Sequence, residues 1–151
     1  MDDPVSMMVS YIKAEVVSCI HLYGSWTPRT IKTIVERFEF AELAFDKKQY
    51  STVEILARDY TLPMSVACTP QMILASKPNG EFVDSLRSMG KRFDEARFVV
   101  IEHHYDDEME ETESFLKERG FHLREIMGGS DIFIASLYHR IMPPATKSRQ
   151  R

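Results

Sequence analysis

The sequence has little cysteine. Its 151 residues contain two, Cys19 and Cys68, which are far apart along the chain. Two cysteines are too few for the disulfide framework that stabilises small secreted domains. The pattern therefore favours two buried thiols in a protein of a reducing compartment.

Glycine is also sparse, and the glycine-rich motifs of catalysis and phosphate binding are missing. The six glycines stand at positions 24, 80, 90, 120, 128 and 129. The sequence contains no G-x-G-x-x-G, G-x-x-x-x-G-K, G-x-S-x-G, C-x-x-C or H-E-x-x-H. Motifs therefore give no support for a phosphate cradle, a serine hydrolase or a zinc protease, and no metal site is expected.

Long apolar runs are absent as well. No stretch approaches the roughly 18 apolar residues of a membrane-spanning helix, and no secretory signal peptide is recognisable. We therefore expect a soluble, cytoplasmic protein without a membrane partner. The net charge is −4, and three cations in the last nine residues leave −7 for the body of the chain. An acidic body argues against nucleic acid as a partner.

What the sequence does have is the composition of one globular domain, 44% hydrophobic and 28% charged. We predict a single α/β domain over residues 1–142, with a helical amino-terminal segment at 1–38 and a sheet-forming part at 39–142. Residues 143–151 lack apolar periodicity and are expected to form a mobile basic tail.

The clearest pattern lies between residues 96 and 137. Phe98–Ile101 is short, apolar and β-branched, which is typical of a strand buried on both faces. Asp106 and Asp107 are placed to cap a following helix, which Gly120 ends. Residues 121–127 and 131–137 then predict two strands joined by a turn.

Outside residues 96–137, the pattern of helices and strands is less clear. Apolar residues three or four apart predict one helix over Val5–Tyr23, and Thr27-Pro28 supplies a cap for a second. Residues 71–80 cannot be assigned. The remaining expectations are strands at 39–45 and 64–68 and helices at 53–60 and 82–89.

Alternating strands and helices predict a mainly parallel, Rossmann-like sheet with an antiparallel carboxyl-terminal return strand and amino-terminal helices packed on it. Ligands bind such sheets at the carboxyl ends of strands. Two strand ends qualify, one at Cys68-Thr69-Pro70 and one at Glu102–Glu108. In the second, alternation places Glu102 and His104 on one face and His103 on the other, so Glu102 and His104 are the candidate catalytic pair. The alternative is that these residues and the following carboxylates are solvated strand-end and helix-capping groups.

Three segments within residues 51–137 carry a family resemblance. The segment "STVEILARDYTLPMSVACT" is similar to the helix and strand that precede the D-x-E-G motif of FkbM-type methyltransferases. The segments "EFVDSLRSMGKRFDEARFVVIEHH" and "FLKERGF" resemble the helices and the strand that follow in that family.

The resemblance implies the carboxyl half of a class I methyltransferase fold, with S-adenosylmethionine as the cofactor of an active member. It also implies a truncated or degenerate domain, because "ACTPQM" replaces D-x-E-G and the upstream glycine-rich cofactor loop is missing.

Two alternatives from other functional classes stay open. One is a non-catalytic α/β module that binds a protein partner. The other is a small acyltransferase-like enzyme with His103 or His104 as its base. Acetyltransferases of the GNAT type also end in strand, helix, G-F, strand and strand, but their R/Q-x-x-G-x-G/A motif is absent here. The oligomeric state and the substrate do not follow from the sequence.

We predict that deleting residues 143–151 leaves the melting temperature nearly unchanged, because this tail has no apolar face to dock on a core. Thermal denaturation of the full and shortened chains measures the difference. A drop of several degrees would show that the tail is packed against the domain.

Overall fold

The computed structural model describes residues 4–12, 17–24, 26–39, 41–45, 64–65, 71–76, 80–104, 107–128 and 133–141. The helices are α1 (Pro4–Tyr11), α2 (Pro28–Arg37), α4 (Gly80–Met89), α5 (Lys91–Asp94) and α6 (Glu110–Glu118). The strands are β1 (Cys19–Tyr23), β2 (Glu42–Phe45), β3 (Met64–Ser65), β4 (Met72–Ser76), β5 (Phe98–His104), β6 (His122–Gly128) and β7 (Phe133–His139).

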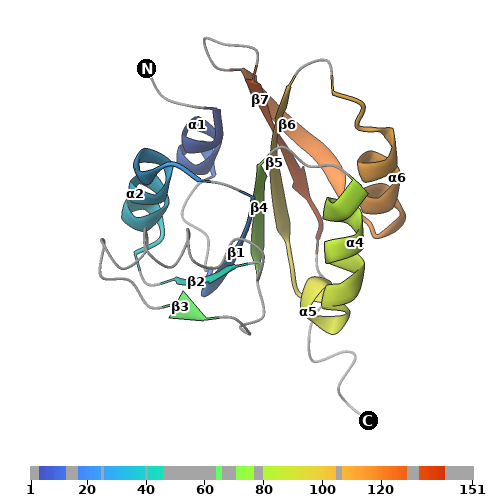
Figure 1. Cartoon of the computed structure of the whole chain (residues 1–151), viewed down its shortest axis with the longest axis horizontal. Helices are drawn as coiled ribbons and strands as arrows, with labels where there is room; N and C mark the ends of the chain where they lie inside the picture. Colours follow the sequence, from blue (N-terminus) through green and yellow to red (C-terminus); the bar gives the residue numbers. More distant parts are fainter. Residues whose placement is uncertain are drawn as a thin grey trace.

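The strands form one sheet in the order β3-β2-β1-β4-β5-β7-β6. The pairs β1–β2, β1–β4, β2–β3 and β4–β5 are parallel. β7 runs antiparallel to both of its neighbours, β5 and β6. The predicted fold class is confirmed: the sheet is mainly parallel, and its antiparallel return strand lies next to β5 (Figure 1).

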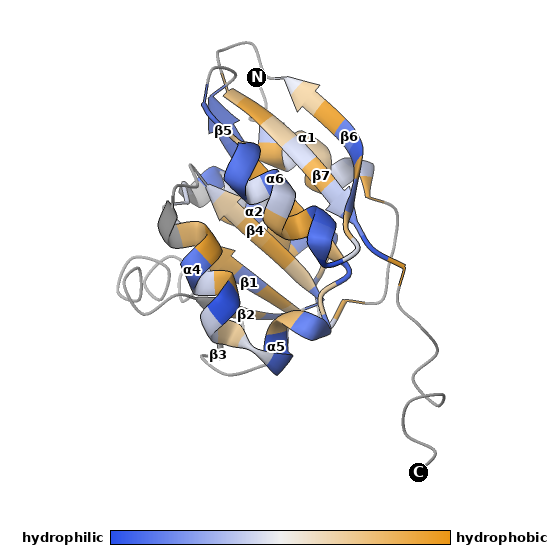
Figure 2. Ribbon diagram, turned by 90° about the vertical axis from the view of Figure 1, so that its right-hand side faces the viewer, coloured by the Kyte–Doolittle hydropathy of each residue, from blue (hydrophilic) through white to orange (hydrophobic). Residues whose placement is uncertain are grey.

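Helices cover both faces of the sheet, so its central strands are buried on both sides. α1 and α2 lie on one face, and α4, α5 and α6 lie on the other (Figure 1). Phe98 and Val100 belong to the core cluster of the first face, and Val99 and Ile101 belong to that of the second. β4 is accordingly apolar over most of its length, whereas parts of β5 and β6 and the outer sides of α4 and α6 carry hydrophilic residues (Figure 2).

Gln71 joins the amino ends of the three central parallel strands. Its side-chain Oε1 accepts hydrogen bonds from the backbone N–H groups of Ser18 and Cys19, at 2.8 and 3.0 Å, and one from the Ser18 hydroxyl at 2.9 Å. Its own N–H donates to the Cys19 carbonyl, and its carbonyl accepts from Arg97 and Phe98. One residue therefore sets the register of β1, β4 and β5 together.

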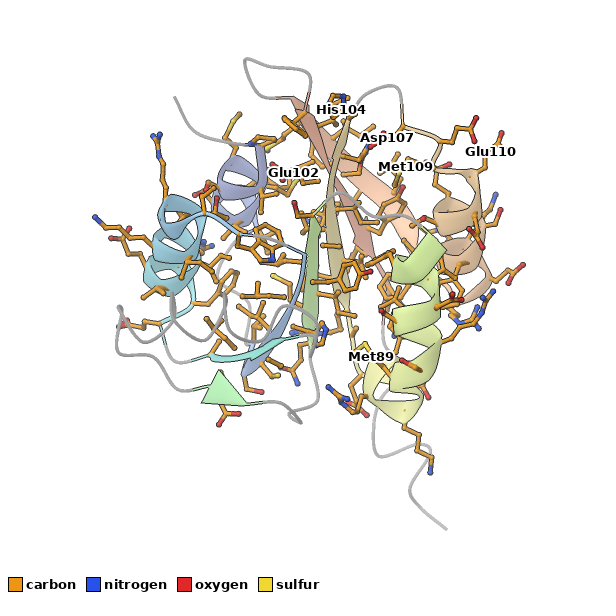
Figure 3. The ribbon with its side chains drawn as sticks, viewed as in Figure 1. Met89, Glu102, His104, Asp107, Met109 and Glu110 are labelled. Carbon is orange, nitrogen blue, oxygen red and sulfur yellow. The ribbon has the colours of Figure 1, made fainter. Side chains whose placement is uncertain are left out.

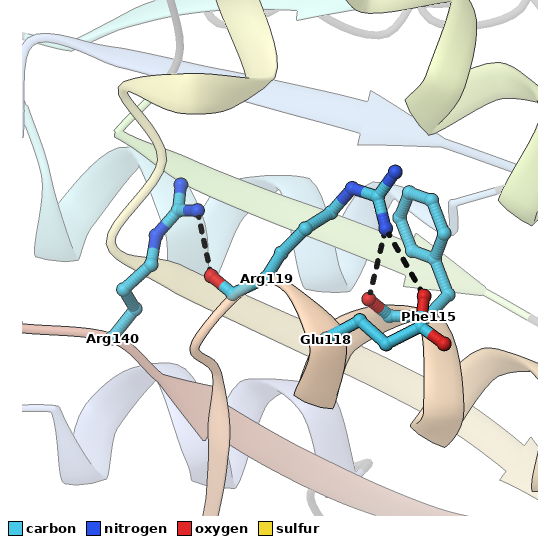
Figure 4. Close-up of polar contacts among 4 residues, drawn as sticks. All are labelled: Phe115, Glu118, Arg119 and Arg140. Carbon is cyan, nitrogen blue, oxygen red and sulfur yellow. Dashed lines mark hydrogen bonds and ion pairs between the residues drawn. The ribbon is translucent and has the colours of Figure 1, made fainter.

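Arg140, directly after β7, closes the same end of the molecule. Its guanidinium donates to the carbonyls of Phe93, Ala96 and Arg119 at 2.7–3.2 Å, and it lies over the ring of Phe121 at 4.3 Å. Figure 4 shows its bond to Arg119, whose own guanidinium contacts the Phe115 carbonyl and Glu118. Burial lowers the pKa of Arg140, and nearby Asp94 opposes that shift. The residue holds the ends of α5 and α6 against β7.

The prediction of a helix over Val5–Tyr23 is confirmed over α1 and wrong over residues 19–23. Residues 19–23 form β1, with Cys19, Ile20, His21 and Leu22 all buried. A strand buried on both faces is apolar at every position, and so it also satisfies a spacing of three or four. The upstream part of the sheet is thus present in this chain, contrary to the expectation of a carboxyl half alone.

The predicted helix cap at Thr27 and three other predicted elements are present in the structure. The Thr27 cap is confirmed, since its side chain accepts from the Thr30 N–H at 3.2 Å. The strand at 39–45 is confirmed over β2, that at 64–68 over β3, and the helix at 82–89 as α4. The unassigned stretch holds β4, which is buried throughout.

Two further expectations need correction. Asp107 does not cap α6; the carboxylate instead accepts from the His104 N–H at 2.9 Å, and α6 begins after Met109 without a side-chain cap. Cys19 is disulfide-bonded, so it is not a free thiol, because separation in sequence does not decide whether a thiol finds a partner. The reasoning from free thiols to a reducing compartment therefore no longer applies.

Several expectations lie outside the described residues. They are the helix at 53–60, the thiol of Cys68, the strand end at 68–70, the cap at Asp106 and the tail at 143–151.

Ile101→Ala should lower the free energy of unfolding by about 2–5 kcal/mol, because Ile101 is fully buried in the central strand β5. Ile141→Ala is the matched control, since Ile141 is 86% exposed and its truncation should change stability by less than about 0.5 kcal/mol. Denaturant unfolding measures both variants. Equal losses for the two would contradict the central position of β5.

Candidate functional site

The carboxyl ends of β1, β4 and β5 lie side by side at one edge of the sheet. From β1 the chain proceeds to β2 on one side, whereas β4 and β5 continue on the other. This reversal of strand order is where open α/β sheets bind ligands, because the connections diverge there and leave a crevice. The candidate site is therefore the edge formed by Gly24, Ser76 and Glu102, which we call the carboxyl-edge site.

Gly24 follows β1 and turns the chain tightly across β4. Its φ is +101°, a conformation that L side chains rarely adopt. A Cβ at this position would lie 2.7 Å from the backbone oxygen of Ser76, which is a steric clash. Only glycine fits both requirements, so the turn after β1 is fixed by backbone packing.

Ser76 links β4 to β5 at the same edge. Its hydroxyl donates to Oε1 of Glu102 at 3.0 Å, across a pair of residues that face each other in the parallel register. Ser76 is buried, whereas Glu102 is half-buried. Contacts therefore run without a break from Gly24 through Ser76 to a carboxylate that still reaches solvent.

The two histidines of β5 have different surroundings. His103 is buried; its Nδ1 lies 2.8 Å from the His104 carbonyl, and its Nε2 lies 3.1 Å from the Ser136 hydroxyl. A carbonyl only accepts, so Nδ1 donates, and a neutral ring then accepts the Ser136 hydrogen at Nε2. Both ring nitrogens are used within the fold, which makes His103 a structural residue.

His104 is half-buried at the end of β5, and its ring meets Phe133 edge-on with centroids 4.6 Å apart. Strand alternation places it on the same face as Glu102, two residues or about 6.6 Å along the strand. Glu102, His104 and Asp107 gather at one end of β5 (Figure 3). The structure thus brings the predicted pair Glu102 and His104 to one edge, with Ser76 as the hydroxyl partner of Glu102.

Trp26 is a residue of this edge that the sequence did not single out. It lies in the turn between β1 and α2, is 5% exposed, and its Nε1 has no hydrogen-bond partner among the residues that the structure describes. A buried N–H without a partner costs free energy, so such a group in a ligand-binding region marks a place for an acceptor. Its signal in the sequence was being the only tryptophan, two residues after Gly24.

The described residues contain neither a cluster of metal ligands nor a membrane-spanning helix. No group of three or more His, Cys, Asp or Glu side chains there could hold a metal ion. None of the helices in that part of the chain is long and apolar enough to cross a membrane.

Comparison with solved structures identifies the fold. A ribosomal protein L11 methylase from Lactobacillus delbrueckii subsp. bulgaricus matches with a TM-score of 0.64 and 11% identity, over 90% of this chain and 76% of that one. A precorrin-6y C5,15-methyltransferase from Geobacter metallireducens matches with 0.64 and 9%, over 89% and 86%. The chain has the Rossmann-like fold of class I methyltransferases.

A third similar structure contains a ligand. It is a Streptococcus pneumoniae protein described as a tRNA (m1A22) methyltransferase, in complex with S-adenosyl-L-methionine. The match has a TM-score of 0.62 and 12% identity and covers 99% of this chain and 78% of that one. At the level of sequence, no family model and no curated protein matches the chain.

Gly24→Ala should destabilise the protein by about 1–3 kcal/mol, because the new Cβ adds a clash with Ser76 to an unfavourable φ. Gly128→Ala is the matched control, since a Cβ there meets nothing within 4 Å. Urea unfolding of both variants measures the difference. Two variants of equal stability would show that the turn after β1 is not held tightly against β4.

Proposed function

We propose that this chain is a divergent methyltransferase-like domain that binds S-adenosylmethionine at the carboxyl-edge site. Three observations support the proposal: the sheet order, the tight turn at Gly24, and the half-buried carboxylate of Glu102 beside the point where strand order reverses. The resemblance of residues 51–137 favours the FkbM type within this fold. The observation that carries the proposal is the row of contacts from Gly24 through Ser76 to Glu102.

The charged and hydrogen-bonding groups of the carboxyl-edge site match those of S-adenosylmethionine. The ligand carries a sulfonium and an ammonium cation, which a carboxylate such as Glu102 can stabilise. It also carries hydroxyl, carboxylate and ring-nitrogen acceptors. The Nε1–H of Trp26, which has no acceptor in the described part of the chain, is a buried donor in the turn after β1. Glu102 and Trp26 are therefore the residues that we expect to hold the cofactor.

The turn at Gly24 is also the reason that we propose a degenerate domain. A G-x-G-x-x-G loop lets the backbone approach a ligand closely at several positions. This chain has a single glycine there, and Gly24 approaches Ser76 of its own fold. One tight turn thus stands in place of the glycine-rich loop. We therefore expect S-adenosylmethionine to bind with a dissociation constant on the order of 0.1–1 mM.

When bound, S-adenosylmethionine supplies an electrophilic methyl group. The protein's own contribution would come from Glu102 and His104. Glu102, positioned by the Ser76 hydroxyl, would hold the cofactor through its cation. His104, oriented by Phe133, would hold the substrate or take up the proton. His103 has no part in this chemistry, because its ring is occupied by Ser136 and the His104 carbonyl.

Calorimetric titration with S-adenosylmethionine and S-adenosylhomocysteine tests the proposal. We expect saturable binding of both, and Glu102→Gln should raise both dissociation constants at least about tenfold, or about 1.4 kcal/mol. The glutamine keeps an acceptor for Ser76 and removes only the charge. Glu110→Gln, on the exposed start of α6, is the control with the same change of charge and should bind as the unmodified protein does.

Each contrary result has a definite meaning. Absence of binding at several millimolar ligand would refute the assignment of S-adenosylmethionine as the ligand. Binding that Glu102→Gln leaves unchanged would place the cofactor away from the carboxyl-edge site. Thermal denaturation of each variant, run alongside, separates loss of binding from loss of fold.

A further inference from the structure

The opposite end of the sheet carries a surface that the proposed function does not use. β6 is the last strand in the sheet order, so one of its two long edges has no neighbouring strand among the residues that the structure describes. The described residues include four exposed large hydrophobic side chains, and two of them, Leu123 and Ile126, lie on β6 at 48% and 52% exposure. A third, Tyr11, lies beneath the guanidinium of Arg124 at 6.0 Å. Apolar area is therefore concentrated along an open strand edge, where strand pairing takes place.

A bulge sorts the side chains of β6 onto two faces. The register with β7 shifts between Leu123 and Glu125, so that Leu123 pairs with Tyr138 and Glu125 pairs with Leu137. Tyr138 belongs to the core cluster under α6 and Leu137 to the cluster under α1, which places Leu123 on the α6 face of the sheet and Glu125 on the α1 face.

The neighbouring residues follow the same division. Ile126 pairs with Ser136, whose hydroxyl contacts His103 on the α6 face. Arg124 contacts Tyr11 of α1 on the other face. The exposed edge therefore has an apolar pair, Leu123 and Ile126, on one face and an opposite-charge pair, Arg124 and Glu125, on the other.

This pattern is complementary to itself. If two copies of β6 lie antiparallel about a two-fold axis between Arg124 and Glu125, each Arg124 lies opposite the Glu125 of the second copy. On the other face, each Leu123 lies opposite an Ile126, and the four side chains form one apolar cluster. A two-fold contact must match a surface with itself, and opposite charges on adjacent residues meet that condition. Cross-strand pairs of both kinds stabilise antiparallel strands.

We infer that the β6 edge is a homodimer interface, in which two copies of this chain join their sheets antiparallel through residues 122–127. The contact is centred on reciprocal Arg124–Glu125 ion pairs and on the apolar cluster of Leu123 and Ile126. The carboxyl ends of β1 and β4 lie across the sheet from this edge, separated from β6 by β5 and β7.

Analytical ultracentrifugation of charge variants tests the interface. The unmodified protein should form a dimer whose dissociation constant rises with salt. Arg124→Glu and Glu125→Arg should each raise that constant at least about tenfold, because each places like charges opposite one another. The double variant R124E/E125R exchanges the two charges, re-forms both ion pairs and should return the constant to within about threefold of the unmodified value.

Control variants separate this interface from a general charge effect. Lys32→Glu, on the exposed face of α2, makes the same change of charge as Arg124→Glu and should leave dimerisation unchanged. Leu123→Ser combined with Ile126→Ser should weaken the dimer while retaining the fold, since both side chains are exposed. A monomer at hundreds of micromolar protein would overturn the inference. A dimer that both single charge variants leave intact, or that the double variant fails to restore, would also overturn it.

Discussion

The structure depends first on the alignment of three parallel strands, and Gln71 provides it. Parallel neighbours are joined by long connections, so no tight turn sets their register as a hairpin turn would. Gln71 supplies a local substitute, because its side chain and backbone contact the starts of β1, β4 and β5 together. A slip of one residue in any of these strands would exchange their buried faces and break the pattern of bonds around Gln71. Everything at the carboxyl edge, including the pairing of Ser76 with Glu102, inherits its position from that alignment.

Sequence patterns predicted the carboxyl-terminal part of this fold better than the amino-terminal part. Residues 98–139 alternate between a buried strand, an amphipathic helix ending at Gly120 and two strands, so each element has its own period. β1 and β4 are buried on both faces and lack such a period. The sequence pattern therefore predicts the end of a helix at β1 and assigns no element to β4. A run of apolar residues shows burial, and only its neighbours in space decide whether it is a strand.

The candidate site was predictable in part for the same reason. Glu102 and His104 follow a strand that the pattern identified, so their shared face and edge position followed from alternation. Gly24 and Trp26 follow β1, and Ser76 ends β4, which are the two strands that the pattern missed. The approach of Gly24 to Ser76 joins segments about 50 residues apart. The chemical difference between the two histidines also required the structure, because a hydroxyl on β7 decides it.

The place of β7 in the sheet has a consequence for how the chain folds as it is synthesised. β7 is the last of the described strands along the sequence, yet it lies between β5 and β6. Until residues 133–139 have left the ribosome, β6 has no strand to pair with and β5 exposes one of its edges. A chaperone that binds exposed strands would therefore meet a domain in which the edges of β5 and β6 are unpaired. These edges become paired when β7 emerges and inserts between them. Arg140 follows at once and ties the ends of α5 and α6 to that strand.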